Sequence, residues 1–559
     1  MIKIVKNRNC GEEIVFAESE LKLFLGKYEE VIAAEDTEGN EKFISLGDTE
    51  IAREYGVLRY LEGLNDYGFY IKTVNRGYCI VSPTEKGVRF GIYSLLKEIC
   101  LLEIYAEDEI YSDDELDWKE VELKEEPSFD FYDSSWLGWN KYSVEFAKRR
   151  RLRIAPFINS YHSFFEMMPK SKYLDEHRDW YSENYTQLCM TNEEMIAEFI
   201  RNSLDLIDKK AFKTGNTSCL MVGQEDSGEY CQCARCKKSY EKYGVSGTLI
   251  RFVNQVAKAV NEYVNNKYVG KTVKTVTFAY GTTENPPVDE NNRPVDSSVM
   301  LEKNVVIMTA PITSDFAKPL YDEKFNAAAS RSFKGFAALG AEIYMWAYNS
   351  VFDDQLMYFG QWDVLRENLE FYKKVNAQYM IDMGNPLPDV SFDALTTYVR
   401  TSLAWNLNLD EKRLIDDFFA AYYKETAPYV RRYFDESNEW QRKKNIKYTL
   451  YAQQSLECKT AEYWDFEKVK EWAELLRQGE NAAGSKKIAL RVTAQKLTPL
   501  YMLLEIFIDK FSKEQLRELI GEFEKAARET FVLYTEETGI QYMRDIRNKL
   551  VKWRSLLLP

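Results

Sequence analysis

The chain has 559 residues, of which 45% are hydrophobic and 14% are aromatic. This length predicts about two to four domains, and the apolar content excludes an intrinsically disordered protein. The formal net charge of −15 argues against nucleic acid and anionic membranes as partners, because both require a basic surface.

The N-terminal residues lack the apolar core of a signal peptide, and no run of about 18 apolar residues occurs. We therefore expect a cytoplasmic protein without a membrane partner, and we leave a homo-oligomer open. With only two histidines, the sequence argues against a histidine-ligated metal centre and against Ser-His-Asp hydrolysis.

Residues 1–125 are predicted to form an N-terminal α+β domain. Residues 16–28 and 87–99 have the apolar periodicity of amphipathic helices, and residues 43–46, 68–74 and 77–81 read as strands. This segment contains no dense polar cluster, so it offers no candidate site of its own.

Residues 126–405 alternate between short apolar segments and helical patterns. The predicted strands are residues 129–136, 153–158, 218–223, 273–280, 305–310, 342–347 and 378–383. Near-continuous apolar strands that alternate with helices indicate a parallel sheet covered on both faces. An eighth strand would close a (β/α)8 TIM-like barrel. A doubly wound sheet is the alternative, but no G-x-G-x-x-G follows the first strand.

Residues 406–559 are predicted to form a C-terminal all-helical domain. The candidate helices, of which the first still belongs to the preceding domain, are residues 393–405, 411–434, 439–455, 466–478, 486–508, 513–534 and 539–556.

Polar and aromatic residues follow the predicted strands where these end. They include Asp133, Ser134, Trp136, Asn159, Tyr161, His162, Gln224, Glu225, Asp226, Tyr280, Trp346, Tyr348, Asn349, Asp382 and Asn385. Barrel enzymes keep their chemistry at this edge, and carboxylates beside aromatic rings are typical of a carbohydrate site. We expect His162, Asn159, Trp136, Tyr280, Trp346, Tyr348 and Asn349 to bind the sugar.

Cleavage of a glycosidic bond requires one carboxyl group as proton donor and a second as nucleophile or base. Glu225 or Asp226 is the predicted donor, and Asp382 is the predicted nucleophile or base. Adjacent strand residues point in opposite directions, and because Gln224 and Asp226 share a face, we favour Asp226. A structural role of the acidic pair, as a helix cap or loop carboxylate, is the alternative.

A C-x-C-x-x-C cluster follows the acidic pair at Cys231, Cys233 and Cys236, and Cys189 is the best fourth ligand. Four thiolates form a closed tetrahedral site, which is typical of a structural Zn²⁺ ion. Free thiols in a loop are the alternative. We expect no organic cofactor.

The basic run at residues 148–153 (KRRRLR) could indicate nucleic-acid binding. It joins a predicted helix to a predicted buried strand, so a solvated helix end fits it better.

Residues 129–434 resemble a widespread bacterial group of glycosidase-like proteins, described as a domain of unknown function. The resemblance rests on His162, His177, Gln187-Leu188-Cys189, Gln224-x-Asp226, Cys231-x-Cys233-x-x-Cys236, Ala279-Tyr280, Pro286-Pro287, Trp346-x-Tyr348 and Leu403-x-Trp405. The preceding module, with residues 87–93 (GVRFGIY), is similar to the non-catalytic domain ahead of the barrel in β-hexosaminidases and α-glucuronidases. A four-cysteine zinc site of the same spacing recurs in one family of bacterial β-galactosidase barrels.

The sequence departs from these families at two positions. The β-hexosaminidases carry an Asp-Glu pair, whereas the order here is Glu225-Asp226, and related sequences often end the last strand with Glu where this chain has Asp382. We expect an exo-acting glycoside hydrolase that removes a terminal sugar, because the N-terminal module and the zinc-held loop would narrow the barrel mouth. The two departures favour the alternative, a non-catalytic carbohydrate-binding or scaffold protein on a glycosidase fold.

Overall fold

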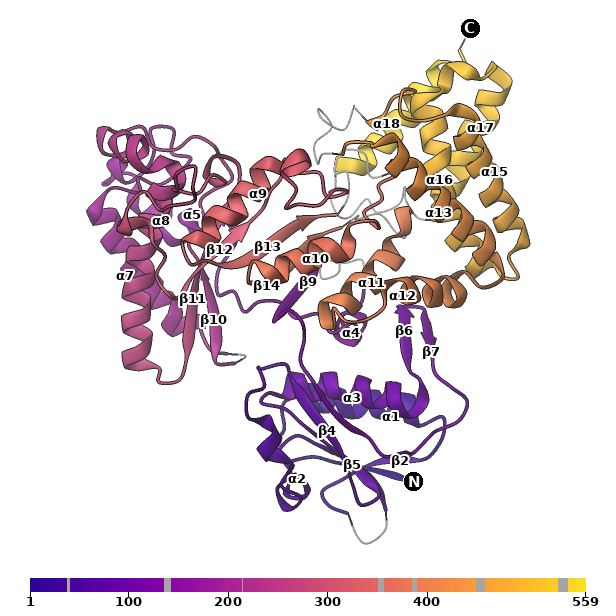
Figure 1. Cartoon of the computed structure of the whole chain (residues 1–559), viewed down its shortest axis with the longest axis horizontal. Helices are drawn as coiled ribbons and strands as arrows, with labels where there is room; N and C mark the ends of the chain where they lie inside the picture. Colours follow the sequence, from indigo (N-terminus) through magenta and orange to yellow (C-terminus); the bar gives the residue numbers. More distant parts are fainter. Residues whose placement is uncertain are drawn as a thin grey trace. The chain divides into compact units, whose positions relative to one another are not determined.

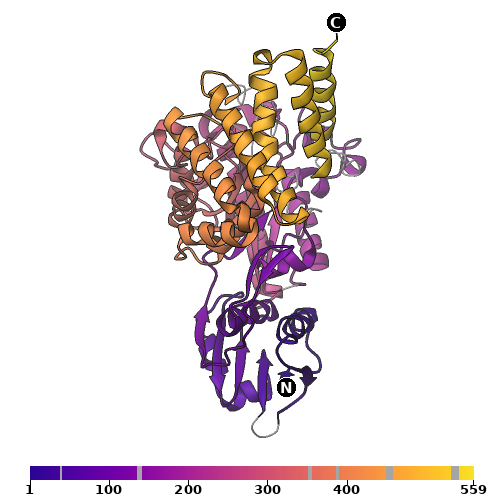
Figure 2. The ribbon, with the colours of Figure 1, turned by 90° about the vertical axis from the view of Figure 1, so that its right-hand side faces the viewer.

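The computed structural model describes residues 1–37, 41–134, 142–213, 215–349, 356–384, 390–448, 458–530 and 541–558. The predicted site residues Trp136 and Asn385 lie outside the described residues. The chain divides into two compact units (Figures 1 and 2). Unit 1 comprises Met1–Asp130, Leu137–Leu152 and Ala394–Ala427, and unit 2 comprises Phe131–Trp136, Arg153–Asp393 and Pro428–Pro559. The three domain boundaries expected from the sequence stay a prediction.

Unit 1 is built on a six-stranded mixed sheet. Its strands, in spatial order, are β2 (Val31–Ala34), β1 (Ile2–Val5), β3 (Lys42–Leu46), β5 (Gly77–Val81), β4 (Phe69–Val74) and β8 (Glu122–Glu125). Helices α1 (Glu12–Leu25) and α3 (Glu85–Cys100) pack together on one face (Figure 1). A second apolar cluster, which includes residues of α2 (Glu50–Glu54), covers the other face. This arrangement confirms the predicted N-terminal α/β sheet.

Helix α3 follows from local signals in its sequence. The Thr84 hydroxyl accepts the backbone N–H of Gly87 and thereby caps the helix. A Cβ atom at Gly91 would lie 2.5 Å from Ile80, so glycine at this position lets the helix approach the sheet closely. The hairpin of β6 (Glu103–Ala106) and β7 (Glu109–Tyr111) follows α3, and α4 (Val144–Arg149), α11 (Asp393–Trp405) and α12 (Glu411–Phe418) complete the helices of the unit.

Unit 2 contains a six-stranded, entirely parallel sheet. The spatial order is β10 (Thr217–Met221), β11 (Thr272–Ala279), β12 (Val305–Thr309), β13 (Glu342–Tyr348), β14 (Ala377–Met383) and β9 (Phe131–Ser134). The helices α7 (Glu193–Lys210), α8 (Ala234–Lys267), α9 (Glu323–Ala338) and α10 (Leu365–Lys374) alternate with the strands along the chain. The predicted parallel α/β sheet is therefore confirmed.

A complete eight-stranded barrel is not present among the described residues. β14 pairs directly with β9, which leaves no place for an eighth strand between them. The predicted second strand, residues 153–158, forms only isolated bridges, one from Arg153 to β9 and one from Phe157 to β10. Pro156 contributes to this irregularity because its nitrogen cannot donate to a ladder. The sheet is thus a curled half-barrel whose two edge strands both contact this segment.

The pleat of this sheet sorts the side chains onto two faces. Ring contacts of 5.1 Å between Tyr344 and Tyr379 and of 5.8 Å between Tyr379 and Phe131 define what we call the aromatic face. The register places Asp133 and Trp346 on this face as well. Tyr132 and Asp382 alternate with these residues and therefore lie on the opposite face.

The C-terminal part of unit 2 is entirely helical in the described residues, as predicted. It contains α13 (Ala427–Lys444), α15 (Phe466–Ala482), α16 (Lys486–Ile506), α17 (Lys513–Glu529) and α18 (Gln541–Ser555), which run side by side (Figure 2). The single helix predicted over residues 411–434 is wrong, because α12 ends at Phe418 and the chain turns at Lys424, where φ is 48°. Within the described ranges, no helix combines the length and apolar character needed to cross a bilayer.

Asp315 offers a test of the packing in unit 2. Burial raises the pKa of this carboxyl group to about 6, although it accepts backbone hydrogen bonds from Ala317 and Tyr448. The unfolded chain has a pKa near 3.9 at this position, so the folded protein binds the proton more tightly. The stability that this proton contributes is present below about pH 4 and is lost as the pH rises to about 6.

We expect Asp315→Asn to remove this pH dependence. Relative to the wild type, the unfolding free energy of the variant should rise by about 3 kcal/mol between pH 4 and pH 7. Urea unfolding at several pH values measures the difference. A constant difference across this range would contradict the assignment.

Candidate functional site

The two acidic residues after β10 have different surroundings. The Glu225 carboxylate accepts the backbone N–H of Phe165 at 2.8 Å and caps the short helix α5 (Phe164–Met167). Asp226 is exposed and accepts the hydroxyl of Tyr280 at 2.8 Å. Glu225 thus has the structural role of a helix cap that was the alternative to catalysis. Asp226 is the more accessible of the two carboxylates.

A row of aromatic rings extends from Tyr280 across the aromatic face. His162 lies 6.3 Å from Tyr280 and is stacked on Phe278 at 5.2 Å. Phe278 contacts Trp346 at 6.1 Å, and Trp346 contacts Tyr161 edge-on at 5.2 Å. The ring of Trp346 is half-buried, and its Nε1 has no hydrogen-bond partner among the described residues. Such rings can stack on the C–H face of a sugar, and the indole N–H can donate to a hydroxyl.

Burial keeps the tyrosines of this row protonated. It raises the pKa of Tyr161 to about 12. Burial and the bond to Asp226 together hold the pKa of Tyr280 well above its usual value. Tyr280 therefore stays protonated over the physiological pH range and can donate its hydrogen bond to the Asp226 side chain. His162 is fixed by a 2.7 Å contact between its Nδ1 and the backbone carbonyl of Gln224.

Asp133 is a buried carboxylate on the aromatic face. The hydroxyl of Tyr379 reaches it at 3.5 Å, and its negative charge adds to the burial that raises the pKa of Tyr161 and Tyr379. The sequence predicts that Asp133 lies at the end of a strand but indicates no role for it. Its spacing of two residues from Phe131 in the same strand is the signal that could have identified its face.

Asp382 lies on the opposite face and is only 3% exposed. One carboxylate oxygen accepts the Tyr132 hydroxyl, and the other accepts the Asn349 side-chain amide at 2.7 Å. Asn349, which was predicted to bind substrate, therefore contacts Asp382. The catalytic role predicted for Asp382 stays a prediction.

The remaining predicted substrate ligands differ in their contacts. Both polar atoms of the Asn159 side chain bond the backbone of Met221, at 2.8 Å each, in the manner of a neighbouring strand. Tyr348 is half-buried and contacts Phe316 edge-on at 5.9 Å. Asn159 therefore fixes the segment before His162 to β10, whereas Tyr348 remains a candidate for contact with a sugar.

Glu284 is a buried carboxyl group to which the sequence analysis gave no role. It follows the short turn Gly281–Thr283 after β11, and burial raises its pKa. Its Oε1 has no partner among the described residues. The neighbouring Thr283 hydroxyl accepts the buried Gln224 amide at 2.9 Å.

The four predicted metal ligands, Cys189, Cys231, Cys233 and Cys236, come together in one cluster. All four sulfur atoms lie within 4.8 Å of one another. The Cys189 sulfur lies 3.7 Å from those of Cys233 and Cys236. A tetrahedron with Zn–S bonds of about 2.3 Å has S···S edges of about 3.8 Å, so these thiols fit Zn²⁺ or a similar ion.

The local fold prepares these cysteines for a metal. Cys233 and Cys236 lie at the start of helix α8, where the helix dipole favours thiolates. Hydrogen bonds from Cys189 and Cys231 lower the pKa of Cys236. Four sulfur ligands complete a tetrahedron, so a bound ion would be structural.

Gln187 links the cysteine cluster to residues 225–231, which follow β10 and which we call the acidic loop. It is fully buried and lies two residues before Cys189. Its amide donates to the carbonyls of Glu225 at 2.7 Å and Ser227 at 2.8 Å, and its oxygen accepts the N–H of Glu225 at 3.1 Å. These three bonds hold the backbone on both sides of Asp226.

Further bonds join the same two segments. The Thr186 hydroxyl donates to the carbonyl of Glu229 at 3.0 Å, and the Glu183 carboxylate accepts the N–H of Gln232 at 2.8 Å. Cys231 lies between these two contacts, so a metal ion would tie the end of the acidic loop to the segment that carries Gln187.

We expect the purified chain to contain about one zinc ion, bound by the four cysteines. Cys236→Ser should lose most of this metal and lower the melting temperature. Cys79→Ser, which alters a buried cysteine outside the cluster, is the control and should keep the metal. Elemental analysis by mass spectrometry provides the measurement. A wild type whose stability is unchanged after removal of the metal by a chelator would contradict the expectation.

Gln187→Ala should loosen the acidic loop without unfolding the unit. Because three hydrogen bonds are lost, we expect the amide hydrogens of residues 225–231 to exchange at least about ten times faster than in the wild type. Gln441→Ala is the matched control, because Gln441 is also buried and bonds the backbone of Gly360 through both polar atoms. Hydrogen–deuterium exchange separates the two variants. Equal exchange of residues 225–231 in both would show that Gln187 does not hold the loop.

Several solved structures match the chain at low sequence identity. The family GH115 4-O-methyl-α-glucuronidase BtGH115A, with specificity for decorated arabinogalactans, matches with a TM-score of 0.58 and 12% identity over 99% of this chain and 78% of that chain. CpGH84D matches with a TM-score of 0.47 and 9% identity over 99% and 96% of the two chains. A GH138 enzyme targeting pectin rhamnogalacturonan II matches with a TM-score of 0.42 and 10% identity over 100% and 99%.

No curated protein sequence matches the chain. The likeness to BtGH115A establishes a glycoside-hydrolase-like fold, as expected from the sequence. Residues 105–435, which are more than half of the chain, match the family described as "Domain of unknown function (DUF4838)", and the chain belongs to this family.

Proposed function

We propose that the chain is an exo-acting glycoside hydrolase that removes a terminal sugar from an oligosaccharide or glycan. The observation that carries the proposal is the exposed Asp226 carboxylate, held by Tyr280 at the end of the aromatic row. A carboxyl group beside stacked rings at the carboxyl edge of a parallel sheet supplies both a proton donor and a sugar platform.

Asp226 is the proposed proton donor to the leaving oxygen. The Tyr280 hydroxyl orients this carboxyl group, and the Gln187 bonds hold its backbone. Glycosidic cleavage requires a second carboxyl group about 5 to 10 Å away on the other side of the bond. Asp133 is our candidate, because it lies on the aromatic face. Trp346 and His162 are the proposed sugar contacts.

A catalytic role of Asp382 remains the alternative to that of Asp133. Its burial and its bonds to Tyr132 and Asn349 support a positioning role instead. A nucleophile must approach the anomeric carbon, and a carboxylate whose two oxygens are both engaged must first release one bond. We therefore assign Asp382 to holding β9, β13 and β14 together.

The proposed substrate classes follow from the fold and from the resemblance of the N-terminal module. BtGH115A is a 4-O-methyl-α-glucuronidase, so α-glucuronides come first, and β-hexosaminides follow from the resemblance of the N-terminal module. The hydrogen bonds between the acidic loop and the segment with Gln187 fix the loop around Asp226, and exo action at this site is part of the proposal.

A non-catalytic carbohydrate-binding protein is the second candidate. The carboxylates of Glu225 and Asp382 both accept hydrogen bonds from neighbouring groups, so Asp226 is the accessible one of the three predicted catalytic residues. A site with one accessible carboxylate favours binding without cleavage. Binding of an oligosaccharide without turnover would support this candidate.

The test compares the wild type, Asp226→Asn and Asp208→Asn on a panel of aryl glycosides and oligosaccharides. Asp208 is a matched control, because it also accepts tyrosine hydroxyls on the surface, at 2.8 Å from Tyr263 and 2.7 Å from Tyr268. We expect Asp226→Asn to lower kcat by about 100-fold or more on the substrate that the wild type cleaves. Asp208→Asn should retain wild-type kcat.

Two results would contradict the proposal. Equal turnover by the wild type and Asp226→Asn would remove Asp226 from the mechanism. Binding of sugars by calorimetry with no cleavage by the wild type would favour the second candidate. Release of single sugars from chain ends, seen by chromatography, would support exo action.

A further inference from the structure

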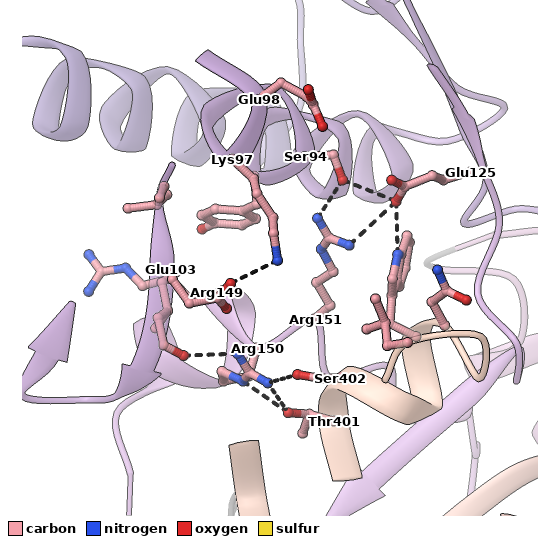
Figure 3. A pocket seen from close by; sticks show the side chains of 16 residues that line it. Ser94, Lys97, Glu98, Glu103, Glu125, Arg149, Arg150, Arg151, Thr401 and Ser402 are labelled. Carbon is pink, nitrogen blue, oxygen red and sulfur yellow. Dashed lines mark hydrogen bonds and ion pairs between the residues drawn. The ribbon is translucent and has the colours of Figure 1, made fainter. Parts of the chain in front are cut away.

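The basic run near α4 is not the solvated helix end that the sequence suggested. Arg149, Arg150 and Arg151 line a cavity of about 230 Å³ within unit 1 (Figure 3). The side chains of Arg149 and Arg151 are each only 15% exposed. The cavity is bounded by the end of α3, by β6 and by the end of α11.

The three guanidinium groups are held rigidly in the wall. Arg149 makes two parallel bonds to Glu20, at 2.8 and 2.9 Å. Arg150 donates to the carbonyl of Ile104 at 2.9 Å and to the hydroxyl of Ser402 at 2.8 Å. Because these groups are already ordered, a ligand that binds them loses little side-chain entropy.

Arg151 adds a strained backbone to this wall. Its φ of 57° lies in the left-handed region, which is unfavourable for a residue with a side chain. The conformation ends α4 and directs the guanidinium group onto Trp405, at 4.3 Å, and Ser94, at 2.7 Å. Burial lowers the pKa of Arg151, which shows that its charge is poorly solvated.

Several hydrogen-bond donors in the wall are not used by the described residues. Arg149 bonds Glu20 through Nε and Nη2, which leaves Nη1. Lys97 uses one of three N–H groups, on Glu103 at 2.8 Å. The Asn406 side-chain oxygen accepts a backbone N–H, and its amide nitrogen has no hydrogen-bond partner among the described residues. These three side chains thus offer unused donors, which suit an oxygen-rich anion.

The cavity wall carries charges of both signs. It contains four cationic side chains, Lys97 and the three arginines, and three carboxylates, Glu98, Glu103 and Glu125. Arg149 is paired with Glu20, Lys97 with Glu103 and Arg151 with Glu125, so the charges in and behind the wall are balanced. The case for an anion therefore rests on the unused hydrogen-bond donors.

We propose that this cavity binds a small oxyanion, a carboxylate or a phosphate, through Lys97, Arg149 and Asn406. A volume of about 230 Å³ holds about eight water molecules, which excludes an oligosaccharide but admits inorganic phosphate or a single uronic acid. Guanidinium and ammonium groups bind both oxyanions by charge-assisted hydrogen bonds. The proposal does not depend on the proposed hydrolase activity.

Isothermal titration of the full chain at low salt tests the proposal, with inorganic phosphate, glucuronate and neutral glucose as probes. We expect one phosphate ion to bind per chain, glucuronate to displace it, and glucose not to bind. Lys97→Ala should weaken binding about tenfold. Lys22→Ala is the matched control. Both lysines pair with a glutamate, and their side chains are similarly exposed, 42% for Lys22 and 55% for Lys97.

Asn406→Asp provides a second variant, whose carboxylate should repel the anion and reduce binding by at least about tenfold. Titration of Asp226→Asn with glucuronate separates this cavity from the proposed hydrolase site, since binding here should persist in that variant. Absence of binding by both anions, binding of glucose with equal affinity, or unchanged affinity in the folded Lys97→Ala and Asn406→Asp variants would overturn the proposal.

Discussion

The two-residue alternation of the unit 2 strands determines the face of the sheet on which each carboxylate lies. The register of β13, β14 and β9 places Trp346, Tyr379 and Asp133 on one face and Asp382 on the other. A carboxylate on the aromatic face meets rings and the groups at the sheet edge, whereas one on the opposite face is enclosed by neighbouring side chains. The bonds of Asp382 to Tyr132 and Asn349 follow from this placement.

The acidic loop depends on a second constraint, the cysteine cluster. Loops carry many active-site groups, but a general acid requires a fixed position. Gln187 and the neighbouring contacts bind the loop to the segment that ends at Cys189, and Cys231 lies at the loop's other end. A closed metal site can thus position Asp226 without touching a substrate, which is the usual role of structural zinc.

The sequence predicted the parallel strands well, because buried parallel strands read as short apolar runs between helical patterns. The four-cysteine cluster was predicted from spacing alone, since three thiols within six residues already form most of a tetrahedral site. Residues 153–158 were misjudged as a strand, because their apolar character is the same whether they pair fully or form isolated bridges. The closure of β14 against β9 is a long-range pairing that no local pattern specifies.

Side-chain placement was harder to predict than the strands. The basic run at Arg149–Arg151 reads as a solvated helix end, and the left-handed turn at Arg151 that buries it has no sequence signal. Glu225 and Asp226 are chemically alike, and their separation depends on the position of α5, which approaches only in the folded unit. The two-residue spacing between Phe131 and Asp133 indicates that they share a face. Which face this is becomes clear only from the ring contacts across the sheet.

The most direct test of the two-face account compares Asp133→Asn and Asp382→Asn for kcat and melting temperature on the same substrate. The account predicts that Asp133→Asn loses turnover with little change in melting temperature, because the side chain acts at the aromatic face. It predicts that Asp382→Asn lowers the melting temperature while the remaining folded protein keeps turnover. The reverse pattern, with turnover lost only in Asp382→Asn, would contradict the account.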